Sequence, residues 1–355
     1  MADDGVRMDA VREWLAARWG SPVDVAIQGK PGSGFSADNV IFTAAVDGRT
    51  TTHVLRVDSS GEQPYPEQAP GLGVGVALQS RVMAAIQDRV PVAPIVGVEL
   101  ESSVLGAPFL VMDFVEGVVP KENPPCTAEG FYADAEPALR ENMIRSGLGV
   151  LADLQSVPWR ERGLTDLECG STLGAARQLE LWGAHLRRAL RGRDADIFGI
   201  ADDRLRSGLP PAPTDDDVVL LWGDARLGNV IWDDDSGTPR CVTDFEGVAL
   251  GERELDLGWW LMADRWMHEG SGVPRLAGEP TRAEQVAIYE DVAGRPVADL
   301  HWYELFAAYR FAATVVVVMN NWESAGVVPS DHLIWRDNPA TDLIQAILDN
   351  DREPA

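Results

Sequence analysis

Three polar residues stand at distinctive distances within residues 218–246. Asn229 follows Asp224 by five positions, and Asp244 follows Asn229 by fifteen. A carboxylate can orient a hydroxyl group and accept its proton, and carboxylate and amide oxygens are ligands that Mg²⁺ accepts. Phosphoryl transfer needs both functions in one place, since the metal bridges the phosphates while the base holds the attacking hydroxyl. The spacing therefore predicts phosphoryl-transfer chemistry.

The chain around these residues predicts how they are positioned. Short apolar runs at residues 218–221 and 230–232 read as strands, and a third strand over residues 240–243 runs into Asp244. The acidic, Gly-containing segment 233–237 reads as the turn of a hairpin. Asp224 and Asn229 then lie in the loop between the first two strands. A hairpin with a solvated acidic turn is the alternative interpretation.

The same residues carry a resemblance to a known family. Residues 222–229, with Trp222 in place of the usual His, are similar to the H-G-D-x-x-x-x-N loop of aminoglycoside phosphotransferases and their relatives. Asp244-Phe245-Glu246 resembles their D-[FW]-[EG] segment, and residues 251–257 resemble their G-x-x-x-x-D-L. The resemblance implies an α+β, two-lobed protein-kinase-like fold. We expect a sheet-rich nucleotide-binding lobe over residues 1–116 and a larger helical lobe for catalysis and substrate over residues 117–355.

The resemblance also implies roles for individual residues. Asp224 is expected to orient the substrate hydroxyl and accept its proton, and Asn229 and Asp244 are expected to hold Mg²⁺. Arg226 stands two residues after the base, where protein kinases have a lysine. Its cation could neutralise charge on the transferred phosphoryl group. Trp222 is expected to support the loop rather than to react.

A Gly-rich segment over residues 29–36 lies between two expected strands. Glycines let backbone N–H groups approach phosphate oxygens closely, although many hairpins also contain several glycines. Gly34 and Ser36, followed by Asn39, are similar to the Gly-x-Ser-Asn nucleotide loop of the family, with the Asn displaced. We therefore expect Gly34 and Ser36 to contact the nucleotide.

Two departures from the family pattern follow. Arg56, in the expected strand 51–57, stands where the family has a phosphate-binding Lys, and Gln79, in the expected helix 76–89, stands where it has the partner Glu. Arg presents a planar, permanently charged fork, so it replaces Lys as a cation but not with the same geometry. The alternative interpretation places Arg56 on an edge strand facing water. Residues 59–75, between strand and helix, read as a Pro/Gly-rich mobile linker.

Residues 108–115 form an apolar strand that is similar to the hinge between the lobes of this family. The resemblance implies that Met112, Asp113 and Val115 bind an adenine through backbone groups. Beyond residue 117 the hydrophobic periodicity is mostly helical. The expected helices span residues 135–155, 173–191, 201–208, 253–269, 281–292, 299–322 and 340–348, and one more precedes the sheet at 8–19.

Composition limits the partners and the compartment. The 355 residues carry a formal net charge of −26, which disfavours nucleic acids and anionic membrane surfaces. The longest apolar run, residues 311–319, is far below the ~20 residues that cross a bilayer. Three cysteines without metal-binding spacing and an N-terminus without a signal pattern predict a cytoplasmic protein.

The sequence thus predicts an ATP- or GTP-dependent, Mg²⁺-dependent phosphotransferase acting on a hydroxyl of a small molecule. The acceptor could be cationic, given the acidic chain, or partly apolar, given twelve tryptophans concentrated in the helical half. The substrate and the oligomeric state stay open. Two alternatives remain: a nucleotide- or metabolite-binding protein of the same fold with weak catalysis, favoured by Arg56 and Gln79, and a Mg²⁺-dependent hydrolase.

Overall fold

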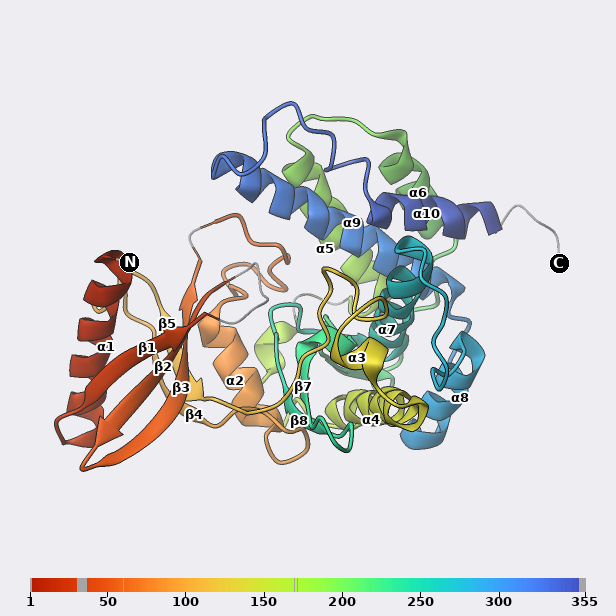
Figure 1. The fold of residues 1–355 in the computed structure, drawn as a ribbon. Coiled ribbons are helices and arrows are strands. Elements are labelled where there is room, and N and C mark those ends of the chain that lie inside the picture. Colours follow the sequence, from red (N-terminus) through yellow and green to blue (C-terminus); the bar gives the residue numbers. More distant parts are fainter. Residues whose placement is uncertain (1, 31–36, 60, 169, 171, 351–355) are drawn as a thin grey trace.

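A small sheet-rich lobe and a larger helical lobe make up the chain (Figure 1). The computed structural model describes residues 2–30, 37–59, 61–168, 170 and 172–350. The small lobe holds a five-stranded antiparallel sheet in the order β1-β2-β3-β5-β4. Its elements are α1 (Ala2–Trp19), β1 (Asp24–Gly29), β2 (Ala37–Val46), β3 (Arg49–Asp58), α2 (Val76–Ile86), β4 (Ile95–Glu99) and β5 (Phe109–Asp113).

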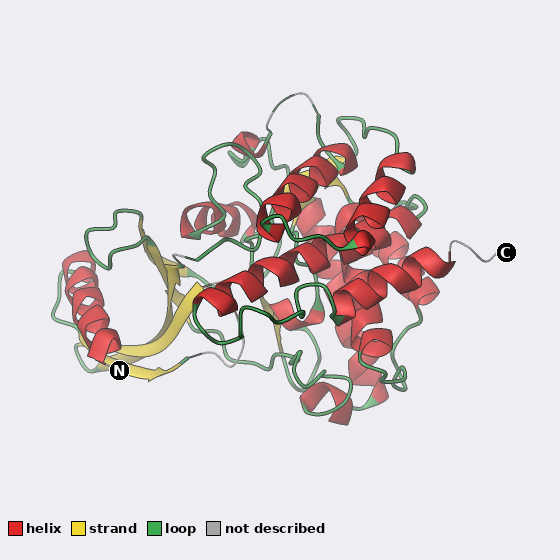
Figure 2. Cartoon of the chain, turned by 90° about the horizontal axis from the view of Figure 1, so that it is seen from above, coloured by secondary structure: helices red, strands yellow, loops and turns green. Residues whose placement is uncertain are grey.

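The two faces of the sheet are covered differently. Met8, Val11 and Leu15 of α1 pack on Phe42 and Phe109, and this small core lies on the side turned away from the helical lobe (Figure 2). Helix α2 covers the other side, where its apolar residues join the core of the large lobe. The sheet is therefore fixed to the helical lobe through α2.

Arg56 lies on the central strand of this sheet. Strand β3 pairs with β2 on one side, where Arg56 faces Asn39, and with β5 on the other, where Arg56 faces Leu110. The interpretation of Arg56 as a water-facing residue on an edge strand is therefore wrong. A central strand holds its backbone through two ladders, which fixes the position from which the Arg56 side chain leaves the sheet.

The large lobe is mainly helical, with the short strands of the catalytic region inserted in it. Strand β6 pairs with β9, and β7 pairs with β8. The elements are α3 (Phe131–Asp134), α4 (Pro137–Gln155), η1 (Thr165–Leu167), α5 (Ala175–Leu190), α6 (Asp196–Ser207), β6 (Val218–Leu221), η2 (Leu227–Asn229), β7 (Val230–Trp232), β8 (Pro239–Val242), β9 (Ala249–Glu252), α7 (Glu254–Arg265), η3 (Trp266–Gly270), α8 (Arg282–Ala293), α9 (His301–Ser324) and α10 (Pro339–Asn350).

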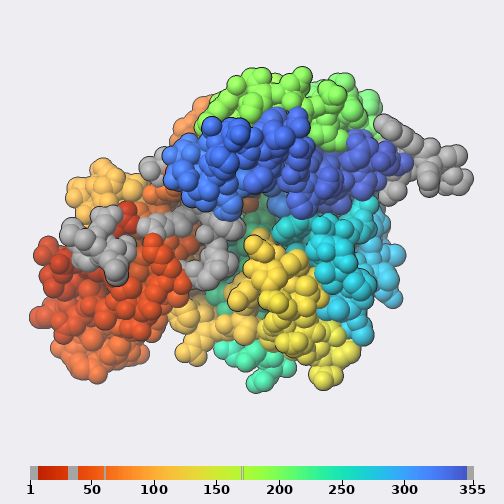
Figure 3. All heavy atoms as spheres, turned by 45° about the horizontal axis from the view of Figure 1, so that its top comes forward, coloured from red at the N-terminus to blue at the C-terminus, as the bar shows by residue number. Residues whose placement is uncertain are grey.

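Helix α9 is the central support of this lobe. It contacts α5, α6, α7 and α10, and Figure 3 shows the C-terminal helices beside the segment that carries α5 and α6. By length and composition α9 could cross a membrane, but 78% of its most apolar window is buried inside the fold. That degree of burial is normal for a core helix, whose side chains face protein on most sides.

Several elements differ from the sequence-based expectation. Helix α6 starts at Asp196 rather than at residue 201, and α7 ends at Arg265, where a π-helical turn begins. Strand β9 was not predicted, because its four residues, ALGE, lack a strand pattern and are held in place by pairing with β6. The capping box of α8, formed by Thr281 and Glu284, is confirmed.

Candidate active site

The loop after β6 is shaped by a buried carboxylate and a close backbone contact. Asp256 of α7 accepts hydrogen bonds from the backbone N–H of Trp222 at 2.7 Å and of Gly223 at 2.9 Å, and it is fully buried. Gly223 has φ +85°, and a Cβ atom there would lie 1.9 Å from the Gly247 carbonyl oxygen. Only glycine fits that contact. These features fix the direction in which the chain enters Asp224.

Asp224 lies at the centre of the site and is almost completely enclosed, with 3% of its surface exposed. Its Oδ1 accepts hydrogen bonds from Arg226 Nε and Trp259 Nε1, both at 2.8 Å, and its Oδ2 accepts one from the Tyr65 hydroxyl at 2.9 Å. Burial, followed by the negative charge of Asp244, raises the Asp224 pKa to about 7, against the opposing effect of the hydrogen bonds from Tyr65 and Trp259. A carboxyl with that pKa is suited to exchange protons at neutral pH.

Asn229 connects the catalytic loop to the segment that carries Asp244. It ends the 3₁₀ turn η2, and its Nδ2 donates to the Asp224 carbonyl oxygen at 3.0 Å. The Asn229 carbonyl oxygen accepts from Thr243 N at 2.9 Å and from Thr243 Oγ1 at 3.0 Å. The hydrogen bond from Nδ2 to the Asp224 carbonyl oxygen fixes the orientation of the Asn229 side chain. Its Oδ1 therefore points away from that carbonyl oxygen.

Asp244 has an unusual backbone conformation and an unsatisfied carboxylate atom. Its φ of 62° lies in the left-handed region, which is uncommon for a residue other than glycine and recurs at functional sites. Its Oδ1 is buried without a hydrogen-bond partner. Trp222 Nε1 donates to the carbonyl oxygens of Thr243 at 2.9 Å and Asp244 at 3.1 Å, so Trp222 supports this segment, as expected for the residue in the place of the family's His.

Arg56 reaches this carboxylate from the small lobe. It forms an ion pair with Glu246, and its Nη2 lies 3.6 Å from Asp244 Oδ1. Gln79 is not its partner: the Gln79 side chain is buried and its Nε2 donates to the Val74 carbonyl oxygen at 3.0 Å. The expected Arg56–Gln79 replacement of the family's ion pair is therefore wrong, because the local turn before α2 uses Gln79 instead.

Two further buried polar atoms lie on the strands that face Asp244. Arg56 Nε and Asn39 Oδ1 have no hydrogen-bond partner, and the two residues are paired across β2 and β3. Buried polar atoms in folded proteins normally have hydrogen-bond partners. Several buried atoms without partners close to one another therefore indicate a site for a polar ligand. Gly34 and Ser36, the other residues expected to contact a nucleotide in this lobe, lie outside the described residues.

The hinge residues lie at the end of β5. The Asp113 backbone N–H donates to the Pro94 carbonyl oxygen at 2.9 Å, and Asp113 Oδ1 lies 3.1 Å from His53 Nδ1. Burial lowers the His53 pKa despite this carboxylate. Met112 and Val115 pack partly buried against the main core. The Asp113 side chain thus contacts His53 of β3. This segment would therefore bind an adenine through its backbone groups.

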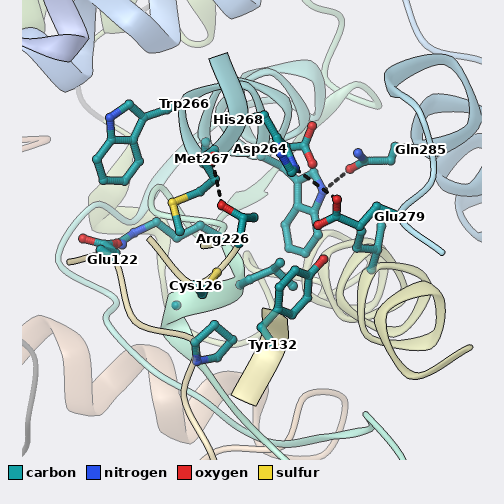
Figure 4. Close-up of a pocket in the computed structure, with 17 residues that line it drawn as sticks. Glu122, Cys126, Tyr132, Arg226, Asp264, Trp266, Met267, His268, Glu279 and Gln285 are labelled. Atoms are coloured by element: carbon teal, nitrogen blue, oxygen red, sulfur yellow. Dashed lines mark hydrogen bonds and ion pairs between the residues drawn. The ribbon is translucent and has the colours of Figure 1, made fainter. Parts of the chain in front are cut away.

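Arg226 joins the base to a small cavity beside the loop. Besides Asp224 it pairs with Glu122, and Figure 4 shows its side chain pointing toward Glu122 along one wall. The cavity has a volume of about 40 Å³, and Asp224 is not among the residues that line it. On the far wall His268 Nε2 lies 3.3 Å from Glu279 Oε2, a contact that raises the His268 pKa against the opposing effect of burial.

Sequence reasoning missed the residues that surround Asp224 but lie far from it along the chain. Tyr65 and Trp259 bond Asp224, and Arg310 donates from Nη2 to the Gly223 carbonyl oxygen at 2.7 Å. The Arg310 guanidinium lies 4.5 Å from the Trp259 ring centre and 4.9 Å from that of Trp182, a double cation–π contact. Their types and spacings carry no signal. Asp256 was within a family motif but had no assigned role.

The structure thus brings most of the expected residues together. Asp224, Arg226, Asn229, Asp244 and Arg56 form one bonded and ion-paired unit between the lobes. The hinge residues lie at the adjacent end of β5, the strand paired with β3.

A curated relative matches part of the chain. The chain is 26% identical over 249 residues to acyl-CoA dehydrogenase family member 10 of Mus musculus; the match covers 66% of this chain and 22% of that protein. The chain therefore spans about a fifth of the length of this curated relative.

Two solved structures show the fold. A candidate aminoglycoside phosphotransferase of Ralstonia eutropha superposes with a TM-score of 0.71 at 23% identity, over 97% of this chain and 98% of that one. A variant of aminoglycoside phosphotransferase APH(4)-Ia, in ternary complex with AMP-PNP and hygromycin B, superposes with a TM-score of 0.51 at 15% identity, over 96% and 98%.

The family model of the phosphotransferase enzyme family APH matches residues 29–306, a range that includes Arg56, Asp224, Arg226, Asn229 and Asp244. The match covers well over half of the chain, and the protein belongs to this phosphotransferase family.

Proposed function

We propose that this protein transfers the γ-phosphoryl group of ATP to a hydroxyl of a small molecule in a Mg²⁺-dependent reaction. One observation carries the proposal: Arg56 of the small lobe meets Asp224, Asn229 and Asp244, which lie in one loop and the following hairpin of the large lobe, in one linked unit. The side chains of this unit are the base, two oxygen ligands and a cation, which are the protein groups that phosphoryl transfer requires.

The unit fits a metal–nucleotide complex. Asp244 Oδ1 is a buried carboxylate oxygen without a hydrogen bond, and Asn229 offers an amide oxygen. Mg²⁺ in such enzymes takes one or two protein oxygens and completes its shell with phosphates and water. When bound, Mg²⁺–ATP supplies the phosphoryl group and neutralises its charge.

The other residues of the unit have defined tasks in this proposal. Arg56, held by Glu246, is a cation for the phosphates, and Asn39 offers a polar atom beside it. Residues 112–115 contribute backbone groups that bind the adenine of the nucleotide. The Asp113 N–H is already bonded to the Pro94 carbonyl oxygen, which leaves the Val115 N–H as the candidate donor. Gly34 and Ser36 are proposed to cover the phosphates.

Asp224 orients the acceptor hydroxyl through a carboxylate oxygen and takes up its proton at that oxygen. Arg226 Nε and Trp259 Nε1 hold Oδ1, so we assign the acceptor to Oδ2, the oxygen that accepts from the Tyr65 hydroxyl in this structure. Arg226 lies beside this carboxylate and offers a positive charge next to the transferred group. The enclosed site excludes bulk water, so these charges act in a medium of low dielectric constant.

The binding-protein alternative loses part of its support. It depended on Arg56 and Gln79 as a weakened pair, but Arg56 has a full carboxylate partner in Glu246. We propose one division of the chain near residues 116 and 117 and a cytoplasmic location. The acceptor is a small molecule with a hydroxyl group; GTP remains a second candidate donor.

The proposal is tested by calorimetric titration of ATP and GTP, with and without Mg²⁺, into wild type and Asp244→Ala. Mg²⁺-dependent binding that Asp244→Ala loses is expected. It would be followed by a screen of hydroxyl compounds for acceptor-dependent ADP release, with Asp224→Asn as the control. Absence of Mg²⁺-dependent nucleotide binding in wild type would overturn the proposal and favour a binding protein for another metabolite.

A further inference from the structure

The oxygen of Asp224 that faces an acceptor already has a hydroxyl on it. Tyr65 Oη donates to Asp224 Oδ2 at 2.9 Å, within the 2.6–3.2 Å that general-base catalysis requires of a reacting hydroxyl. The other oxygen, Oδ1, accepts from Arg226 and Trp259. The Tyr65 phenol therefore stands at the position that the proposed reaction assigns to the acceptor.

Tyr65 belongs to the segment between β3 and α2, residues 61–75, which we call the β3–α2 linker. This segment leaves the small lobe and lies against α5 and α9 of the large lobe (Figure 1). Asn321 binds Glu62 at both backbone groups, donating to its carbonyl oxygen at 2.8 Å and accepting from its N–H at 3.0 Å. His185 Nε2 bonds the Pro64 carbonyl oxygen at 3.1 Å, and Gln178 bonds Gln68 at 2.7 Å. The expected mobile linker is thus held on both sides of Tyr65.

The phenol ring fills a slot with apolar and flat walls. Tyr65 is 7% exposed, and its ring stands edge-on to Trp182 with centres 5.9 Å apart. On another side a Cβ atom at Gly247 would lie only 3.0 Å from Tyr65 Cε1, so the ring touches the backbone there. Arg310, stacked on Trp182, has its charge directed to the Gly223 carbonyl oxygen. The ring is thus held by packing against Trp182 and the Gly247 backbone, and its hydroxyl is held by Asp224.

We propose that the slot occupied by Tyr65 is the acceptor site, that Tyr65 is an internal stand-in for the acceptor, and that the β3–α2 linker must withdraw from Asp224 before an acceptor binds. This inference rests on the proposed function. It assigns the acceptor to the class of molecules that carry their hydroxyl on a flat or slender apolar body, phenols and cyclic alcohols included. The neighbouring cavity of about 40 Å³, which does not reach Asp224, is too small to serve instead.

The reaction in this slot balances without further reactants. The acceptor oxygen forms a bond to the γ-phosphorus of ATP, the bond from that phosphorus to the bridging oxygen of ADP breaks, and ADP leaves with the electron pair. The hydroxyl proton passes to Asp224 Oδ2, the oxygen that now accepts from Tyr65.

Tyr65→Ala tests the assignment, because it empties the slot and p-cresol, the free equivalent of the tyrosine side chain, can refill it. We expect p-cresol to bind Tyr65→Ala and change the fluorescence of the surrounding tryptophans, and we expect neither effect in wild type or in Tyr65→Phe, whose ring stays. With Mg²⁺–ATP, Tyr65→Ala should form p-cresyl phosphate. Without an acceptor, Tyr65→Ala should hydrolyse ATP at least about tenfold faster than wild type. In wild type Tyr65 occupies the slot nearly all the time and keeps water from Asp224, and the substitution removes this block.

Asn321→Ala provides a second variant that leaves Tyr65 and the catalytic residues in place. It should loosen the linker from α9 and raise ATP hydrolysis in the same direction by a smaller factor. The inference is overturned if p-cresol neither binds Tyr65→Ala nor is phosphorylated while ATP hydrolysis equals that of wild type. The proposed function fails separately, if no variant binds Mg²⁺–ATP; p-cresol binding then still decides whether Tyr65 fills a ligand slot.

Discussion

Arg56 of β3 and Glu246, two residues after Asp244, form an ion pair that joins the small lobe to the large lobe. The pair supplies the cation that phosphates need and places its carboxylate partner in the large lobe. In the family pattern we expected that partner on the helix after the strand, at Gln79. The small lobe is thereby tied directly to the segment that carries the proposed metal ligand.

This arrangement predicts different effects for two substitutions near the nucleotide site. Arg56→Ala should weaken Mg²⁺–ATP binding by about 1.5–3 kcal/mol, the range for hydrogen bonds to charged groups. Gln79→Leu is the matched control, because the Gln79 amide donates to the Val74 carbonyl oxygen and, among the described residues, does not pair with Arg56; it should change the Kd less than about threefold. Calorimetry measures both. Equal losses in the two variants would mean that Gln79 takes part in nucleotide binding.

The Asp224 pKa of about 7 predicts the pH dependence of turnover. Because the base must be ionised to accept a proton, kcat/KM should rise between pH 5 and pH 8, with its midpoint near the pKa of the free enzyme. Asp224→Asn should lose turnover while keeping the circular dichroism spectrum and Mg²⁺–ATP binding of wild type. Turnover like that of wild type in this variant would exclude Asp224 as the base.

The same pKa predicts an opposite effect on folding. The folded state raises the Asp224 pKa from 3.8 to about 7, so it binds the proton more tightly than the unfolded chain does. The contribution of Asp224 to stability is therefore complete below pH 3.8 and is lost as the pH rises to about 7. Asp224→Asn carries no charge, so its free energy of unfolding relative to wild type should increase from pH 5 to pH 8, by at least about 1 kcal/mol.

Asp233→Asn is the control for that experiment. Hydrogen bonds from Arg240 and Ser236 hold the Asp233 pKa well below its usual range, so this carboxylate stays ionised throughout the window. Its substitution should therefore change stability equally at pH 5 and pH 8. A pH-independent difference for Asp224→Asn as well would show that the folded state does not raise the Asp224 pKa.

The part of the site that sequence could predict is the part built locally. Asp224, Asn229 and Asp244 lie within one loop and the following hairpin, so their spacing reflects their geometry. Tyr65 reaches Asp224 from 159 positions away, which no spacing encodes. Gln79 was misjudged for a related reason: its position on the helix matches the family, but its side chain bonds the turn five residues earlier.

The fold class was predictable because hydrophobic periodicity and the family resemblance agree on it. The ends of helices were less predictable from the sequence. Helix α7, for example, continues into a π-helical turn at Trp266 without a helix-breaking residue. Strand β9 depends on its partner β6 rather than on its own residues. These differences come from tertiary pairing, which overrides local preference.

Asp256 offers a test of how the loop is held. It accepts two backbone N–H groups, and the amide of Asp256→Asn can accept only one and turns a donor toward the other. Leaving a buried donor unpaired costs about 1–3 kcal/mol, and the variant should lose stability in that range together with much of its kcat. Asp342→Asn, on the exposed surface of α10, should change neither quantity. Thermal unfolding and ADP release measure the two effects, and a fully active Asp256→Asn would contradict the assigned role.

Trp222→His restores the residue that the family usually has at this position. Trp222 is fully buried and contributes its Nε1 to the carbonyl oxygens before and at Asp244, but it makes no contact with the Asp224 carboxylate among the hydrogen bonds of the described residues. Imidazole is smaller than indole, so the substitution should leave a cavity and lower the free energy of unfolding by about 2–4 kcal/mol. An imidazole N–H can still donate to this segment, and kcat should therefore fall less than about tenfold at a temperature where the variant is folded. Chemical denaturation and acceptor-dependent ADP release separate the two effects. A loss of kcat as large as that of Asp224→Asn, in a variant that remains folded and binds Mg²⁺–ATP, would show that Trp222 acts in the reaction rather than in holding Asp244.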